Sequence, residues 1–136
     1  MRDRYDGAKR NPYNEIECGN NYARAMASFA LLPILSGMQY DMSRGHLGFD
    51  PLVNQNNFNA LFAIGHCWGQ YQQTDKECAL RLQGGDCTLR SLGLPSDAVP
   101  AKVLCDDKEI DFTFENNVIS FAPCTFEREL RVKFVK

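Results

Sequence analysis

The chain has 136 residues, of which 44% are apolar and 24% are charged, and its formal net charge is −2. This composition is typical of a globular protein and excludes a disordered, collagen-like or coiled-coil chain. A near-neutral chain has no basic face to neutralise phosphates, so we expect no nucleic-acid partner. No stretch approaches the roughly 18 apolar residues of a membrane span, so we expect no transmembrane segment.

The first ten residues contain no apolar core of a signal peptide, so we expect a cytoplasmic protein. The six cysteines form no C-x-x-C pair, and His46 and His66 are the only histidines that could join them in a zinc site. We therefore expect no metal and no other cofactor. Free thiols are predicted for all six cysteines, with disulfides as the alternative: Cys18, Cys67, Cys78, Cys87, Cys105 and Cys124.

One long helix is predicted over residues 22–35, capped by Asn20 or Asn21 and ended by Gly37. Arg24 is its only charged residue, so the helix is apolar nearly all round. Such a helix must be surrounded, and the rest of the chain covers only part of it. We infer that helices of a larger domain or of a partner subunit cover the remaining apolar surface of this helix. The alternative is that the β layer and a second copy of the chain cover it. The isolated chain should then associate or bind a hydrophobic dye.

A loop is predicted at residues 39–55, and everything beyond it is predicted as β-strand because alternation replaces the helical period. In the aromatic run at residues 58–71, Gly65 and Gly69 indicate bulges or close backbone approach. Trp68 and Tyr71 in this run could form a platform on which a sugar stacks. Aromatic residues in a strand-rich segment belong more often to the core.

Gly84-Gly85 predicts a hairpin between residues 78–82 and 87–92, with Leu82 opposite Cys87. That register places Cys78 opposite Ser91 and therefore disfavours a Cys78–Cys87 disulfide.

Two further turns are predicted at residues 106–107 and 116–117, because Asp and Asn tolerate a positive φ. The second turn places Phe114 opposite Ile119 and Phe112 opposite Phe121 on one apolar face. The last strand alternates apolar and basic residues: Leu130, Arg131, Val132, Lys133 and Phe134.

Two carboxylates stand just before the predicted helix. In an extended segment Glu15 and Glu17 point to the same side about 6–7 Å apart, a spacing also found in glycosidase carboxylate pairs. The alternative is that one carboxylate interacts with the positive end of the helix while the other is solvated. Arg24 needs a partner if it is buried, and it could reach back to either Glu. Structural pairing and recognition of sugar hydroxyl groups both use such a patch.

Residues 10–19 (RNPYNEIECG) and 22–28 (YARAMAS) resemble the C-terminal end of the catalytic domain of glycoside hydrolase family 116. This family includes the non-lysosomal glucosylceramidases and microbial β-glucosidases. The resemblance covers about residues 4–50 and extends to GFDP at 48–51, while Trp68-Gly69 resembles the family's aromatic-glycine segment less closely. Four residues depart from the family pattern: Asn21, His66, Cys67 and Gln70.

The resemblance implies an α+β chain, with the terminal helix or helices of an (α/α)6 barrel in residues 1–55 and a small antiparallel β region in residues 56–136. It also implies that Glu15 and Arg24 bind hydroxyl groups of a glucosyl unit. The family's nucleophile and acid/base belong to segments upstream of this motif, so no catalytic residue is expected in this chain.

The expected function is the C-terminal portion of a retaining β-glycosidase that is inactive as an isolated chain. Its expected partners are a β-glycoside sugar and the rest of the barrel, either as a separate chain or through a homo-oligomer. A non-catalytic carbohydrate-binding or interaction module that uses the sheet and Trp68 is the alternative.

Overall fold

Strict alternation of buried and exposed residues builds the longest hairpin of this computed structural model, which describes residues 29–135. Strand β3 (Asn57–Ile64) pairs with strand β4 (Cys67–Thr74), and the buried residues of both strands lie on one face. The two-residue turn between them has Gly65 first, at a φ of 58°. A glycine at that position suits a turn whose twist matches the twist of the strands.

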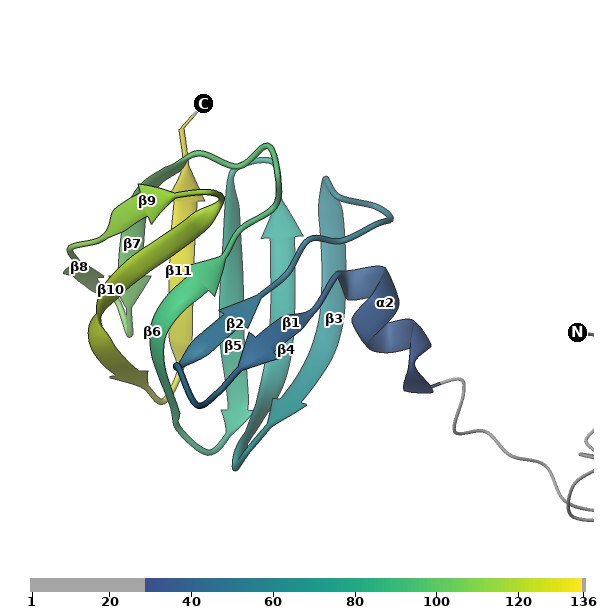
Figure 1. Cartoon of the computed structure of the whole chain (residues 1–136), viewed down its shortest axis with the longest axis horizontal. Coiled ribbons are helices and arrows are strands. Elements are labelled where there is room, and N and C mark those ends of the chain that lie inside the picture. The colour runs from purple at the N-terminus through teal and green to yellow at the C-terminus, as the bar shows by residue number, and fades with distance from the viewer. Residues whose placement is uncertain (1–28, 136) are drawn as a thin grey trace, which may run out of the picture. The chain divides into compact units, whose positions relative to one another are not determined.

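The described strands form two sheets that face each other (Figure 1). The first sheet, sheet A, has the strand order β1 (Gln39–Asp41), β2 (His46–Gly48), β6 (Cys87–Gly93), β10 (Val118–Phe126) and β9 (Thr113–Glu115). The second, sheet B, has the order β3, β4, β5 (Glu77–Gly84), β11 (Glu129–Phe134), β7 (Pro100–Cys105) and β8 (Lys108–Ile110). All neighbouring strands are antiparallel except β2 and β6, which are parallel.

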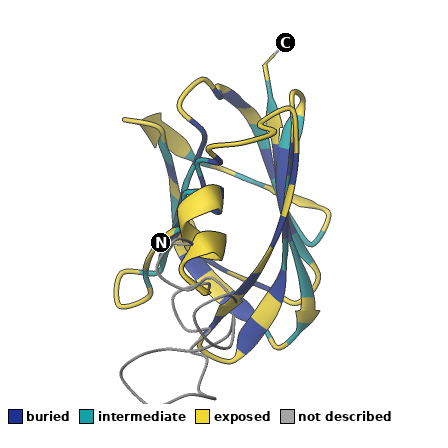
Figure 2. Ribbon diagram, turned by 90° about the vertical axis from the view of Figure 1, so that its right-hand side faces the viewer, coloured by how far each residue is buried: buried dark blue, intermediate teal, exposed yellow. Residues whose placement is uncertain are grey.

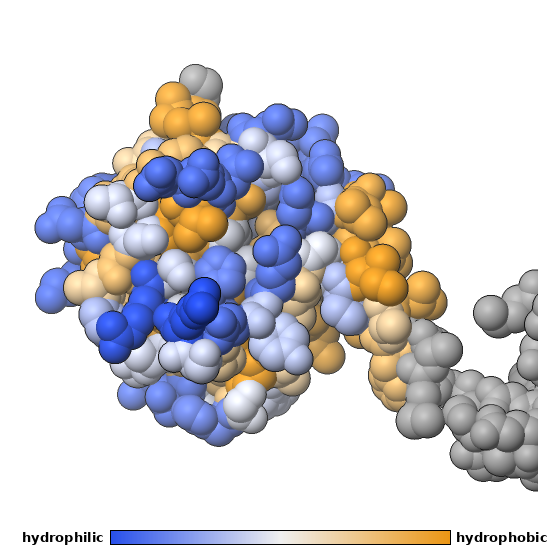
Figure 3. Space-filling model, in the orientation of Figure 1, coloured by the Kyte–Doolittle hydropathy of each residue, from blue (hydrophilic) through white to orange (hydrophobic). Residues whose placement is uncertain are grey.

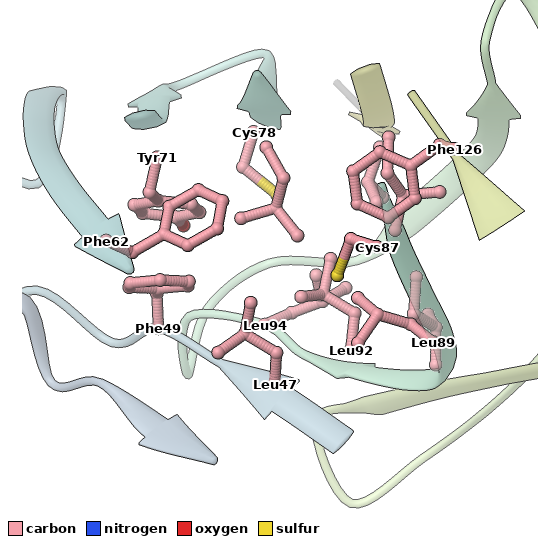
Figure 4. Packing of buried hydrophobic residues seen from close by; sticks show 14 of the residues in the cluster. Leu47, Phe49, Phe62, Tyr71, Cys78, Cys87, Leu89, Leu92, Leu94 and Phe126 are labelled. Carbon is pink, nitrogen blue, oxygen red and sulfur yellow. The ribbon is translucent and has the colours of Figure 1, made fainter. Parts of the chain in front are cut away.

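The hydrophobic core lies between the two sheets, which Figure 2 shows edge-on. Its centre is the stacked pair Phe49 and Tyr71, whose ring centroids lie 4.1 Å apart with an interplanar angle of 8°. Phe62 contacts Phe49 edge to face, and Leu92 and Phe126 fill the neighbouring part of the core (Figure 4). Burying each of these side chains contributes about 1.5–3 kcal/mol, so the sandwich has a substantial core of its own.

The described helix, α2 (Leu31–Ser36), precedes the first strand. Gly37 follows it at a φ of 59°, and Met38 N–H donates to the Pro33 carbonyl, an arrangement that satisfies the last free carbonyls of a helix. The predicted end of the helix at Gly37 is therefore confirmed. The chain divides into two compact units, Met1–Leu31 and Leu32–Lys136, and the sandwich belongs to the second.

Helix α2 exposes its apolar side chains. Leu32, Ile34 and Leu35 each keep two-fifths or more of their surface accessible. Figure 3 shows this helix as an orange apolar surface, and Figure 2 shows its exposed side. The part of the predicted helix that the structure describes is therefore uncovered, as the sequence led us to expect.

The predicted α+β fold, with helices of an (α/α)6 barrel followed by a small β region, is wrong for the described residues. These residues are mostly β-strand in two extensive sheets, and the helix among them has six residues. The strands predicted beyond residue 55 are present, but together with β1 and β2 they form a two-sheet sandwich rather than a small region that follows helices. The predicted loop at residues 39–55 was also wrong in part, because it holds β1 and β2, each three residues long. A strand of three residues is too short to show a recognisable alternation of apolar and polar residues.

The predicted hairpin around Gly84-Gly85 does not form. Strand β5 lies in sheet B and strand β6 in sheet A, so the connection crosses between the sheets. Leu82 pairs with Gly69, and Cys87 pairs with Phe126. The two glycines predict a hairpin locally, but which sheet each strand joins depends on long-range packing.

Both predicted turns, the Asp turn at residues 106–107 and the Asn turn at residues 116–117, are confirmed. Asp106 and Asp107, and Asn116 and Asn117, all have a positive φ. Phe114 pairs with Ile119 as predicted, and this ladder continues only to the Thr113–Ser120 pair. The predicted pairing of Phe112 with Phe121 does not form, because the chain passes from β8 in sheet B to β9 in sheet A at this point. In the last strand Leu130 and Val132 are buried as the alternation predicts.

Within the described part of the chain, no helix is long and apolar enough to cross a bilayer.

Candidate functional site

The single exposed indole of the sandwich packs on a glycine. Trp68 pairs with Gly84 across β4 and β5, beside an irregularity in the register. A Cβ on Gly84 would lie 2.6 Å from the indole nitrogen, so only glycine admits the ring at this position. Half of the Trp68 surface stays exposed. The indole is therefore supported on one side by backbone and open to solvent on the other.

Polar side chains surround this indole on the outer face of sheet B. Gln70 follows Trp68 by two residues on β4, so both side chains point away from the core. The register places Leu61 on one side of Gln70 and Arg81 on the other. Glu129 is the next partner of Arg81. We call this surface the Trp68 face, made of Leu61, Trp68, Gln70, Arg81 and Glu129.

The row from Leu61 to Glu129 crosses four adjacent strands, or about 14 Å at the usual strand spacing. The two sides of the Trp68 face differ in character: Leu61 and Trp68 are apolar and exposed, whereas Arg81 and Glu129 are charged. Gln70 lies between these ends and presents an amide, which both donates and accepts hydrogen bonds.

Glu129 holds the arginine side chains of this face in place. Its Oε1 accepts from Arg81 Nε at 3.2 Å, and its Oε2 accepts from an Arg131 terminal nitrogen at 2.7 Å. Burial acts to raise the pKa of Glu129, but the hydrogen bonds from Arg131 and Arg81 outweigh it and lower the pKa below its ordinary value. Within residues 29–135 the terminal NH2 groups of Arg81 make no hydrogen bond, so they are free to donate to a ligand.

This arrangement suits a neutral ligand with several hydroxyl groups. An indole face packs against the C–H groups of a sugar ring, and amide and guanidinium groups hydrogen-bond its hydroxyls. The Trp68 face therefore offers an aromatic surface and hydrogen-bonding groups that a sugar ring could use.

A second polar region lies at one end of the sandwich, where a hollow of about 270 Å³ is lined by Asp50, Asp75, Asp97, Gln73 and Phe134, among others. Gln73 is buried but fully engaged: its Oε1 accepts from the Tyr71 hydroxyl at 2.6 Å, and its Nε2 donates to the Gln55 carbonyl at 2.9 Å. Ser96 Oγ donates to Asp50 at 3.0 Å. Gln73 and Ser96 already have partners within the protein, and we take the hollow as the weaker candidate.

The structure separates the two aromatic residues that the sequence offered together. Tyr71 is 1% exposed in the core, and Trp68 lies on the outer face. Residues three apart in a strand point to opposite faces, and this spacing already excluded a joint platform. Gln70, Arg81 and Glu129 were missed by sequence reasoning, because only the register of two strand pairs, β4–β5 and β5–β11, brings them together.

Glu15, Glu17 and Arg24 lie outside the described residues, and so does Cys18. His46 falls within the predicted loop but lies on β2, with its Nδ1 2.9 Å from Ser91 Oγ. His66 is exposed in the β3–β4 turn, 3.3 Å from an Asp86 carboxylate oxygen. Within residues 29–135, no group of three or more His, Cys, Asp or Glu side chains is placed to hold a metal ion.

The prediction of six free thiols is wrong for two of them. Cys105 on β7 and Cys124 on β10 form a disulfide that joins sheet B to sheet A. The two residues lie 19 positions apart on strands of different sheets, so no local spacing pointed to the pair. Cys67, Cys78 and Cys87 are free and buried.

The chain matches no protein-family model, and no curated protein sequence matches it significantly.

Proposed function

We propose that this chain is the non-catalytic C-terminal portion of a larger retaining β-glycosidase, and that its β-sandwich binds β-linked sugar on the Trp68 face. The observation that carries the proposal is the exposed indole packed on Gly84, on the same face as Arg81, whose terminal NH2 groups make no hydrogen bond within residues 29–135. Sugar-binding surfaces need this combination of a rigid aromatic ring and fixed hydrogen-bonding groups.

The glycosidase context rests on the resemblance of residues 4–50 to glycoside hydrolase family 116, together with the uncovered apolar helix α2. An apolar surface of this kind is stable when another domain covers it. In this proposal the catalytic domain covers helix α2 and supplies both catalytic carboxylates. Glu15 and Arg24 would then bind hydroxyl groups of the glucosyl unit, and these contacts would strengthen as the ring flattens in the transition state.

The cytoplasmic location expected from the sequence stays a prediction, and the Cys105–Cys124 disulfide weighs against it. Disulfides persist mainly in oxidising compartments such as the periplasm or the extracellular space. We therefore favour an oxidising compartment as the place where the sandwich works.

Calorimetric titration of the chain with a soluble β-glucan oligosaccharide such as cellotetraose tests the sugar-binding part. We expect Trp68→Ala to weaken binding about tenfold or more, because it removes the stacking surface. Asp97→Asn in the hollow is the matched control and should leave binding unchanged. Loss of binding in Asp97→Asn with full binding in Trp68→Ala would move the site to the hollow and contradict the proposal.

The enzymatic part is tested with an aryl β-glucoside. We expect no hydrolysis by the isolated chain and hydrolysis by a longer polypeptide that carries the catalytic domain before Met1. In that polypeptide Glu15→Gln should lower kcat/KM about tenfold to a hundredfold with the fold intact, since a charged hydrogen bond contributes about 1.5–3 kcal/mol. If Glu15→Gln lowers stability but leaves kcat/KM unchanged, Glu15 instead has a structural role as the ion-pair partner of Arg24.

A further inference from the structure

Two turns from different parts of the chain pack against each other at one end of the sandwich. The β3–β4 turn contains His66, and the β5–β6 connection contains Gly85 and Asp86. A Cβ on Gly85 would lie 2.2 Å from the His66 carbonyl oxygen and 2.9 Å from the Cys67 Cα. The two backbones are therefore in direct contact, and Gly85 allows that approach.

The residues that flank this contact meet in pairs. On the outside, His66 Nε2 lies 3.3 Å from Asp86 Oδ1. On the inside, the next residues, Cys67 and Cys87, are neighbours, and the Cys67 thiol helps to raise the pKa of the Cys87 thiol. Cys67 Sγ donates to the Ile64 carbonyl at 3.3 Å. Both cysteines are almost completely buried.

We propose that Cys67 and Cys87 form a second disulfide between the two sheets when the chain folds in the presence of a small-molecule disulfide oxidant. Cys67 lies on β4 of sheet B and Cys87 on β6 of sheet A, so this bond repeats the connection that Cys105 and Cys124 make between β7 and β10. The two bonds lie toward opposite edges of the sandwich, since β4 is next to one edge strand and β7 next to the other.

The chemistry is a thiol–disulfide exchange in two steps. One cysteine thiolate attacks a sulfur of the oxidant, which forms a mixed disulfide and releases one thiol of the oxidant. The second cysteine thiolate then attacks the protein sulfur of the mixed disulfide and releases the other thiol. The two cysteines lose two electrons and two protons, and the oxidant gains both. The contact between the two turns holds these two cysteines near each other on facing sheets.

Burial, followed by the neighbouring Cys67 thiol, raises the pKa of the Cys87 thiol to about 12. A buried thiol with so high a pKa reacts slowly, because the thiolate is the nucleophile. The bond therefore closes while the chain folds or when the two turns open. Cys78 is the internal comparison: it is equally buried and hydrogen-bonded to Tyr71, not to another cysteine.

Oxidative refolding of the full chain tests this inference independently of any sugar. The reduced, denatured chain is refolded in a buffer of reduced and oxidised glutathione, and free thiols are then blocked at low pH in denaturant. Peptide mapping by mass spectrometry should find Cys67 linked to Cys87, Cys105 linked to Cys124, and Cys78 blocked. The inference is overturned if Cys67 and Cys87 are both blocked, or linked to other cysteines, in molecules whose Cys105–Cys124 bond is closed.

Thermal unfolding gives a second readout that tolerates a destabilised variant. A disulfide between Cys67 and Cys87 closes a loop of about 20 residues. In the chain-entropy model of disulfides, closing such a loop should raise Tm by about 10 °C. The rise in Tm between reduced and oxidised protein should therefore be smaller by about this amount in Cys67→Ala than in the wild-type chain. Equal rises in the two proteins would contradict the proposed bond.

Discussion

The pyrrole side of Trp68 rests on Gly84, its register partner on β5, where any Cβ would approach the indole nitrogen to 2.6 Å. Gly84 is therefore the residue that sets the position of the indole. A substitution there tests whether the position of the ring matters, separately from its presence.

Gly84→Ala should displace the indole and weaken sugar binding several-fold, with the chain still folded. The ring can move because it lies on the outer face and is half exposed. Calorimetric titration and circular dichroism check the two parts of this prediction. Gly65→Ala is the matched glycine control, since a Cβ there meets nothing within 4 Å, although its φ of +58° adds strain. Unchanged affinity in Gly84→Ala would show that the orientation of Trp68 is irrelevant.

The Asp106 carboxylate ties the β7–β8 turn to the β10–β11 turn. It accepts backbone N–H hydrogen bonds from Glu127, Arg128 and Glu129 at 2.8–3.0 Å. Asp106→Asn should lower the free energy of unfolding by about 1 kcal/mol, because it removes the charge from a largely accessible carboxylate. Asn tolerates the positive φ of this position, so the turn itself is preserved. Urea unfolding checks the value, with Asp107→Asn as the exposed control.

Asp106 also predicts how stability depends on pH. Burial acts to raise its pKa, but the backbone N–H donors of Glu127, Glu129 and Arg128 lower it below the ordinary value. A depressed pKa in the folded state means that the stabilisation is present above the unfolded pKa of about 4 and is lost as the pH falls through the folded value. The difference in stability between wild type and Asp106→Asn should therefore shrink below about pH 4. A difference that stays constant down to pH 2 would contradict this account.

Tyr71→Phe separates stacking from hydrogen bonding in the core. The ring stack with Phe49 should survive, whereas the buried Gln73 Oε1 loses its donor. An unsatisfied buried acceptor costs about 1–3 kcal/mol, and we expect a loss of that size in urea unfolding. Sugar binding should not change, since Tyr71 faces the core. A loss of sugar binding in the folded variant would place Tyr71 in the site and is not expected.

Helix α2 should bind a hydrophobic dye in the isolated chain. Replacing Leu32 and Ile34 by Gln removes two exposed apolar side chains and should reduce dye fluorescence by about half. Leu52→Gln removes an equally exposed apolar side chain from a loop and should have little effect. A wild-type chain that neither binds dye nor associates in sedimentation would mean that this surface needs no cover.

Sequence patterns predicted local features of the fold, whose conformation is set by a few residues adjacent in the chain. Gly37 ends the helix, and Asn116 and Asn117 form a tight turn, because each conformation depends on the residue itself. The alternation around Leu130 and Val132 was readable for the same reason.

Features that depend on partners far along the chain were not predicted. The residues around Gly84 signal a reversal, but nothing local shows that β5 and β6 join different sheets. The Cys105–Cys124 bond and the Gln70–Arg81–Glu129 row are likewise set by register between strands distant in sequence. The candidate site is built almost entirely from such relationships.

Tryptophan fluorescence tests the central claim most directly, because Trp68 is the only tryptophan in the chain. Titration with cellotetraose should produce a saturable change in emission as a sugar ring covers the exposed indole. The same change should be weaker in Arg81→Ala and absent when glycerol replaces the oligosaccharide. Emission that stays constant as the oligosaccharide is added would contradict the assignment of the Trp68 face as a sugar-binding surface.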